Sequence, residues 1–165
     1  MAKIKLIFFL FCVFLNAQNS DIDIQRIDEL KKLGDSLFNV SNYTDAAKVY
    51  KELVQIDPNS FDFNFKYASA FGLEVEQMPR FKQAKNVREM VKLFERAYEL
   101  DNKNLGLNRA LLEIYLRVPR FFGGGDKKAL SIIKNIYTIS ENEGKKAQQF
   151  YLSLIHISEP TRQDR

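Results

Sequence analysis

Apolar side chains recur every three or four residues over positions 30–56, the spacing that places them on one face of an α-helix. In the first segment these positions are Leu30, Leu33 and Leu37. In the second segment they are Ala46, Tyr50 and Leu53. Pro58 predicts the end of the second helix, because proline lacks a backbone N–H and disfavours helix at the residue before it. The pattern thus predicts two antiparallel helices, with Gly34 allowing a second backbone to come close and Ala46 at the crossing point.

Two degenerate copies of this pattern follow. The second copy carries Tyr67, Ala68 and Phe71 in its first helix and Met90, Phe94, Ala97 and Leu100 in its second. The third copy carries Leu111, Leu112 and Tyr115, followed by Ala129, Ile133, Ile136 and Ile139. Leu33 and Tyr67 are 34 residues apart, whereas Tyr67 and Leu111 are 44 apart. The difference predicts an insertion of about ten residues between the two helices of the second copy.

The insertion has the pattern of a helix extension. Apolar residues at helical spacing are Phe81, Ala84, Val87, Val91, Phe94 and Tyr98. Pro79 precedes them, and proline is well tolerated in a first helical turn, so one long helix is predicted from about Pro79 to Asp101. In the third copy, Pro119 predicts another helix end, three glycines over 123–125 predict positive φ angles, and Asp126 is expected to cap the next helix.

The first copy resembles the tetratricopeptide repeat family over the whole of its pattern. The residues that carry the resemblance are Leu30, Leu33, Gly34, Leu37, Ala46, Tyr50 and Pro58. The resemblance implies an all-α fold of antiparallel helix hairpins, stacked as a short right-handed superhelix. The units are predicted at about 27–59, 60–104 and 105–142, with a partial fourth unit at 143–151. A single such hairpin cannot bury its apolar face, so the stacking of neighbours is expected to supply the stability. An ordinary helical bundle is the alternative.

Both ends of the chain are set apart from the repeat domain, which is predicted to span residues 18–151. Residues 1–17 have two lysines, an uncharged apolar stretch at Leu6–Leu15, and Ala17 before a polar segment, the pattern of a secretory signal. The apolar stretch is shorter than the roughly 20 residues that span a bilayer, and an uncleaved anchor is the alternative. At the other end, Leu152–Arg162 resembles the translation of a transposon-end adapter used in DNA library preparation, so residues 152–165 are predicted to be non-native.

Charge and cysteine content limit the possible partners. The net charge is +4, and it falls to +2 once residues 1–17 and 152–165, which hold four cations and two carboxylates, are set aside. This charge is too small to indicate a nucleic-acid partner. Five cations gather on the predicted long helix at Arg80, Lys82, Lys85, Arg88 and Lys92. A solvated face is the favoured interpretation, and a phosphate- or acid-binding strip is the alternative. Residues 18–151 contain no cysteine, so no disulfide or thiolate metal site is predicted there.

No catalytic pattern is evident. The single histidine, His156, lies in the doubtful tail, so the commonest acid–base and nucleophile pairs are not available. The glycines at 123–125 are followed by Asp126 and two lysines, which does not match the phosphate-binding Gly-x4-Gly-Lys-Ser/Thr loop. A protein without catalytic activity, metal or cofactor is therefore expected.

In the tetratricopeptide family, the first helices of the units line a concave groove. The residues here that match its exposed positions are Lys31, Asp35, Asn39, Phe65, Ser69, Arg109, Glu113 and Arg117. They mix both charges with an aromatic ring, which suits an extended peptide or a helix. Some family members hold a C-terminal carboxylate with Lys and Asn on a first helix. Lys31 matches the lysine, but Asp35 replaces the asparagine and would repel a carboxylate, so that specificity is not predicted.

The signal pattern of residues 1–17 predicts export to the periplasm or the extracellular space, without stable membrane insertion after signal cleavage. The resemblance implies a module that binds a protein or peptide partner in its groove, and no catalysis is expected. Two alternatives remain open at this point. In the first alternative, the repeats are a structural subunit of an envelope assembly, contacted through the convex side or the exposed open end. In the second, they are a fragment of an enzyme whose catalytic part lies beyond the present C-terminus.

Overall fold

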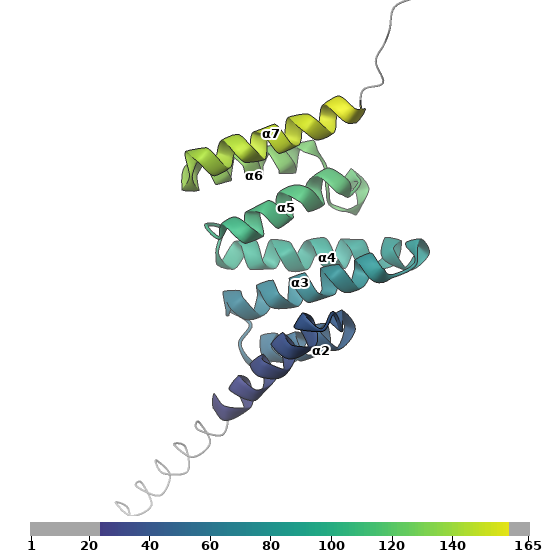
Figure 1. Cartoon of the computed structure of the whole chain (residues 1–165), viewed down its shortest axis with the longest axis vertical. Helices are drawn as coiled ribbons and strands as arrows, with labels where there is room; N and C mark the ends of the chain where they lie inside the picture. The colour runs from purple at the N-terminus through teal and green to yellow at the C-terminus, as the bar shows by residue number, and fades with distance from the viewer. Residues whose placement is uncertain (1–23, 159–165) are drawn as a thin grey trace, which may run out of the picture.

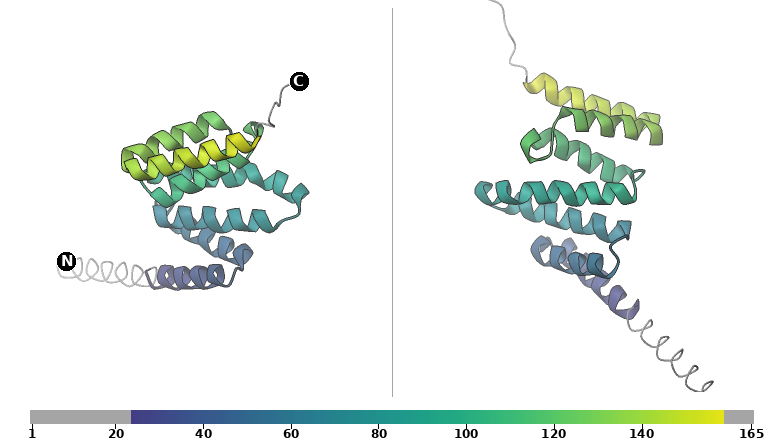
Figure 2. Two further views of the ribbon diagram at one scale, coloured as in Figure 1. Left: turned by 45° about the horizontal axis from the view of Figure 1, so that its top comes forward. Right: turned by 180° about the vertical axis from the view of Figure 1, so that it is seen from behind.

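Residues 24–158, which a computed structural model describes, are helical with short connections, and no strand occurs among them (Figure 1). A helix over residues 24–39 is followed by α2 (Tyr43–Ile56), α3 (Phe61–Gln77), α4 (Arg80–Leu100), α5 (Leu105–Arg117), a 3-10 turn η1 (Arg120–Phe122), α6 (Asp126–Ile139) and α7 (Glu141–Ser158). From α2 onward each helix packs on the next one along the chain, as two further views also show (Figure 2). The predicted all-α fold is confirmed, and the succession of packed helices is consistent with a repeat-like architecture.

Side chains at the helix starts explain several boundaries. Asn42, Ser60 and Asn104 each accept a hydrogen bond from the backbone N–H three residues on, at the start of α2, α3 and α5. Such caps satisfy donors that have no partner within the helix. The predicted long helix is confirmed as α4, and Pro58 and Pro119 follow the ends of α2 and α5 as expected.

Two apolar clusters form the core. The first joins α2 to α3 and includes Ala46, Ala47, Tyr50, Leu53, Phe63, Tyr67 and Ala70. The second runs from α3 to α7 and includes Val91, Phe94, Leu107, Leu111, Tyr115, Ile133 and Ile136 among others. Ala46, which was predicted at a helix crossing, has no exposed surface, and neither do Ala97 and Ala129 in the second helices of the later units. Small side chains at these points let the helices approach closely.

The structure corrects the sequence interpretation at Leu33 and Phe81. Leu33 is 50% exposed, although it was expected on the buried face of the first helix. Successive helical residues are about 100° apart, and because Gly34 is the buried one, its neighbour points to the side. Phe81 is 69% exposed. The buried face of α4 is centred on Met90 and Phe94, and the helical period places Phe81 on the opposite side.

Gly34 and Asp126 differ from expectation in their local roles. The close neighbour of Gly34 is the Tyr50 ring and not a second backbone, because a Cβ atom at position 34 would lie 2.7 Å from Cε1 of that ring. At the start of α6 the capping position is Gly125, with φ +116°, and Asp126 is the first helical residue. Gly123, at φ +108°, is also in the left-handed region, as predicted for this loop.

The same hydrogen bonds between a buried asparagine and the preceding loop occur at two places in the stack. Between α2 and α3, Asn64 donates from Nδ2 to the carbonyls of Pro58 and Ser60, at 3.1 and 2.8 Å. Between α4 and α5, Asn108 does the same to Asn102 and Asn104, at 2.8 and 2.9 Å. Asn64 and Asn108 are 44 residues apart, the same spacing that separates the predicted second and third units. These buried amides tie each unit to the loop before it.

The two ends of the chain were predicted to be a secretory signal and a non-native tail. The predicted secretory signal, residues 1–17, lies outside the described residues. Helix α7 begins at Glu141 and continues to Ser158, past the point where the native sequence was expected to end. The adapter origin of residues 152–165 stays a prediction.

Candidate partner-binding groove

A first hollow lies between the helix over residues 24–39, α2 and α3. It measures about 470 Å³ and is lined by Asp35, Phe38, Asn39, Tyr50, Asp62, Phe65, Lys66 and Ser69. Four of the predicted groove residues are therefore brought together here, namely Asp35, Asn39, Phe65 and Ser69. Lys66 was not predicted from the sequence, although it lies on the first helix of the second unit.

A second hollow of about 540 Å³ lies between α3, α4 and α5. Its apolar lining includes Leu73, Val75, Val87, Met90, Phe94, Ala110, Ile114 and Val118. Polar groups stand among these side chains at Glu76, Gln83, Glu113 and Arg117. The predicted residues Glu113 and Arg117 thus belong to this hollow. An apolar surface with a few polar groups is typical of a site that buries part of a ligand.

A third hollow, of about 290 Å³, lies between α5 and α7 and contains Arg109, Glu113, Glu143 and Phe150. The three hollows share residues. Phe65 and Ser69 line both the first and the second, and Glu113 lines both the second and the third. The three hollows are therefore neighbours along one side of the stack, and we call this surface the first-helix groove. Seven of the eight predicted residues line the three hollows of the first-helix groove, and only Lys31 does not.

Asp35 in the first-helix groove accepts hydrogen bonds from two other helices. Its carboxylate accepts hydrogen bonds from Tyr50 Oη at 2.7 Å and from Lys66 Nζ at 2.8 Å. Partial burial acts to raise the pKa of Asp35, but hydrogen bonds from Lys66 and Tyr50 and the positive charges of Lys66 and Lys31 outweigh it, so the pKa lies below its ordinary value. Lys31 thus acts on the groove through its charge. The negative charge that was expected to repel a carboxylate is compensated by Lys66.

The lowered pKa of Asp35 predicts an acid-dependent loss of stability. A carboxyl group with a depressed pKa in the folded state stabilises the fold fully above its unfolded pKa, near 3.8, and loses that contribution as the pH falls further. In urea unfolding titrations, the free energy of unfolding of Asp35→Asn should therefore decline less steeply below pH 3.8 than that of the wild type. Asp57→Asn, at an exposed loop position, is the control, and equal slopes for wild type and Asp35→Asn would contradict the prediction.

Ion pairs also hold the other end of the first-helix groove. Arg109 on α5 pairs with Glu143 in the first turn of α7, and Arg117 pairs with Glu113 at 2.6 Å. A hydrogen bond from Lys146 and a weaker contribution from the hydrogen bond of Arg109 lower the pKa of Glu143 below its ordinary value. Glu143 follows the capping-box spacing from Ser140, and its N–H donates to the Ser140 hydroxyl at 3.4 Å. The Glu143 side chain pairs with Arg109, so this residue of the first turn of α7 joins α7 to α5.

A second tyrosine, carboxylate and lysine cluster lies away from the groove. Tyr115 Oη donates to Glu95 at 2.9 Å, and Lys128 Nζ contacts the same oxygen at 2.7 Å. Burial is the main cause that raises the pKa of Tyr115, followed by its hydrogen bond to Glu95. The three residues come from α4, α5 and α6, so the cluster joins three consecutive helices, as Tyr50, Asp35 and Lys66 do between the first and second units. Long sequence separations make neither cluster visible from spacing alone.

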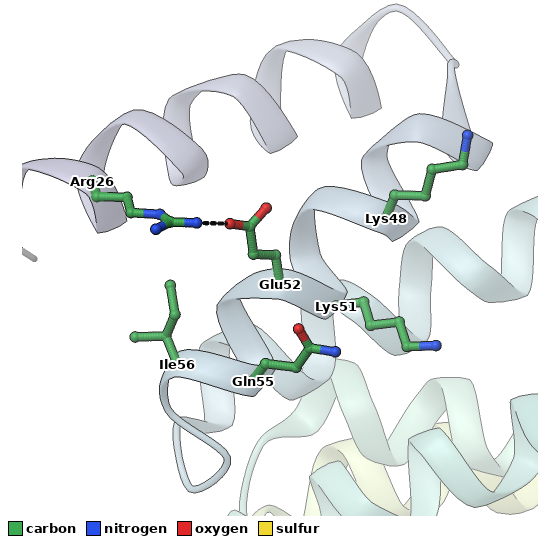
Figure 3. A pocket seen from close by; sticks show the side chains of 6 residues that line it. All are labelled: Arg26, Lys48, Lys51, Glu52, Gln55 and Ile56. Atoms are coloured by element: carbon green, nitrogen blue, oxygen red, sulfur yellow. Dashed lines mark hydrogen bonds and ion pairs between the residues drawn. The ribbon is translucent and has the colours of Figure 1, made fainter.

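A separate hollow of about 440 Å³ lies at the end of the stack nearest residue 24, between the helix over residues 24–39 and α2. Arg26 pairs there with Glu52, while Lys48 and Lys51 point away from that pair (Figure 3). Lys48 is itself paired with Asp45 at 2.8 Å. Two of its three cations are thus neutralised, which leaves little charge for a ligand.

Among the side chains that the structure describes, residues 24–154, no group of histidine, cysteine, aspartate and glutamate is arranged to hold a metal ion. Nor does any helix within residues 24–158 have both the length and the apolar character needed to cross a membrane. Neither the models of known protein families nor the curated proteins include a match to this chain.

Proposed function

We propose that this chain is a tetratricopeptide-type interaction module that binds a peptide or helix of a protein partner in the first-helix groove. The observation that carries the proposal is the sharing of Phe65, Ser69 and Glu113 among three adjacent hollows. A ligand that follows this side of the stack would meet surfaces from four successive units. The resemblance of the first unit to the tetratricopeptide pattern supports the same use of first helices.

The chemistry of the first-helix groove favours an amphipathic ligand. The hollow between α3, α4 and α5 offers apolar side chains such as Leu73 and Ile114. The hollows on either side of it carry charged pairs, Asp35 with Lys66 and Arg109 with Glu143. A helix or extended segment with apolar anchors in its middle and polar groups at both ends matches this order. Most of the charges are already paired with one another, an arrangement suited to recognition and not to proton transfer.

We also propose export of the protein to the periplasm or the extracellular space, with the repeats acting without catalysis. The charge and length pattern of residues 1–17 supports export. A fused reporter that stays in the cytoplasm would reject this part of the proposal.

Ser69→Tyr tests groove binding. Ser69 lies where the first two hollows meet, so a tyrosine side chain there fills the space that a ligand needs. Ser131→Tyr on α6 is the matched control, because both serine hydroxyls donate to a carbonyl of their own helix, Ser69 to Phe65 and Ser131 to Lys128. Each variant is used as bait in a pull-down from envelope extract, after circular dichroism has shown that its helix content is unchanged.

Ser69→Tyr is expected to lose most of the proteins that the wild type captures, and Ser131→Tyr to retain them. If Ser69→Tyr keeps the full set while Ser131→Tyr loses part of it, contacts on other faces of the repeats carry the binding. That outcome would contradict groove binding and favour the structural-subunit alternative.

A further inference from the structure

The outward face of α4 carries an exposed aromatic ring in line with three cations. Lys85, Arg88 and Lys92 follow Phe81 by four, seven and eleven residues, which places all four side chains within a sector of about 60° around the helix axis. Phe81 is 69% exposed, and the three cations are exposed as well. The buried residues Met90 and Phe94 lie on the opposite side of this helix.

The turn η1 adds a second aromatic ring to this face. Arg88 Nη2 donates to the carbonyl of Phe121 at 2.8 Å, which holds η1 beside α4. The Phe121 side chain is 68% exposed and contacts Phe122, with 4.2 Å between ring centres. Arg120, next to it, is also exposed. Figure 1 shows the α3–α4 connection and the α5–α6 connection at the same edge of the stack.

The cations of this face are not neutralised. Among residues 24–158, Lys85, Lys92 and Arg120 have no ion-pair partner, and Arg88 donates to a neutral carbonyl. By contrast, the groove cations Lys66, Arg109 and Arg117 are all paired with carboxylates. Within residues 80–92 the only carboxylate is Glu89. The face therefore has an excess of positive charge around two exposed phenylalanines.

We propose that this α4–η1 surface, made by Phe81, Lys85, Arg88, Lys92, Arg120 and Phe121, binds the anionic headgroup surface of a lipid bilayer. Basic side chains are attracted to anionic lipid, and phenylalanine side chains enter the boundary between headgroups and acyl chains. None of the three hollows of the first-helix groove includes these six residues. A deformable surface accommodates two separate protruding rings, whereas a folded acidic protein would need a matching pocket for each.

The α4–η1 surface is separate from the first-helix groove. Gln83, Val87 and Met90 line the groove from the same helix, but they are on the side of α4 opposite to Phe81. A partner in the groove and a bilayer at the α4–η1 surface therefore contact different faces. Loss of groove binding would therefore leave lipid binding at the α4–η1 surface intact, and the reverse also holds.

Vesicle co-sedimentation of the full chain tests the proposal, with phosphatidylcholine vesicles compared with vesicles that also contain phosphatidylglycerol. Lys85→Glu/Lys92→Glu should lower the partition coefficient on anionic vesicles roughly 25-fold or more, since each cation near the surface contributes about fivefold. Lys103→Glu/Lys134→Glu has the same net charge, also removes two exposed cations that have no ion-pair partner in the described part of the chain, and should have a much smaller effect. Residues 1–17 are present in every variant, so differences between variants report on the surface.

The aromatic part is tested separately. Phe81→Ser/Phe121→Ser should lower the partition coefficient roughly tenfold or more, because the two rings no longer leave water. The control Val40→Ser/Leu130→Ser changes two other exposed apolar residues, 71% and 48% exposed, and should leave it unchanged. Equal losses in the surface and control variants would overturn the proposal. So would phenylalanine variants that bind like wild type together with tight binding of wild type to soluble polyglutamate, which would indicate an acidic macromolecule.

Discussion

Tyr50→Ala is expected to lower the free energy of unfolding by about 3–5 kcal/mol, and Tyr50→Phe by only about 1 kcal/mol. Tyr50 is 2% exposed, and its ring fills the space against Gly34. Alanine leaves a cavity there and removes the hydrogen bond to Asp35, whereas phenylalanine keeps the ring and removes only that hydrogen bond. Urea unfolding followed by circular dichroism measures both. Tyr43→Ala, on the same helix but half-buried, should cost less than Tyr50→Ala.

A double-mutant cycle shows whether Tyr50 acts through Gly34. Gly34→Ala alone should destabilise the fold, because its new methyl group would lie 2.7 Å from the Tyr50 ring. In the Tyr50→Ala background the ring is absent, so the same change should cost much less. Additive effects of the two substitutions, or a Tyr50→Ala effect no larger than that of Tyr43→Ala, would show that the hairpin core is not built around this contact.

Helix positions could be predicted because their signals are local. Prolines at 58 and 119 and the three- or four-residue spacing of apolar side chains act within one helix or one loop. The same spacing could not decide which edge of a helix is covered. Leu33 and Phe81 fit an apolar stripe, yet both are largely exposed, since burial depends on where neighbouring helices lie.

The candidate groove was predictable only in part, for the same reason. Asp35, Phe65 and Glu113 were found from their positions on first helices, and they do line the hollows. Their charge partners come from other helices. Lys66 lies 31 residues from Asp35, and Glu143 lies 34 residues from Arg109. Nothing in the local pattern specifies such pairs, so the compensation of Asp35 by Lys66 required the three-dimensional structure.

The buried asparagines belong to a polar pattern that recurs along the sequence. Asp57 and Asp101 each accept a hydrogen bond from the backbone N–H two residues on, and Asn64 and Asn108 follow each of them by seven residues. Both sets recur at 44 residues, like the apolar positions of units two and three. The tetratricopeptide pattern is defined mainly by apolar and small positions, so these repeated polar residues lie outside it.

Asn108→Asp is expected to cost about 3–5 kcal/mol, more than the roughly 1–3 kcal/mol expected for Asn108→Ala. Asn108 is fully buried, donates to two carbonyls and accepts from Asn135 Nδ2 at 3.0 Å. Alanine leaves these partners without their hydrogen bonds. A carboxylate is worse, because it has no donor and places negative charge against two carbonyl oxygens. Urea unfolding at pH 7 measures both, with Asn39→Asp at an exposed position as the control.

The pH dependence of the free energy of unfolding distinguishes the effect of the charge in Asn108→Asp from the effect of the lost side-chain volume in Asn108→Ala. Burial raises the pKa of the introduced carboxyl, and once protonated it regains one donor, so the deficit of Asn108→Asp should shrink toward acid pH while that of Asn108→Ala stays nearly constant. The damage should also be local, because stacked repeats are stabilised mainly by contacts between neighbours. Amide hydrogen exchange should therefore accelerate in α5 and α6 more than in α2. Equal costs for the two substitutions, or uniform acceleration along the stack, would show that the Asn108 amide does not tie the third unit to its preceding loop.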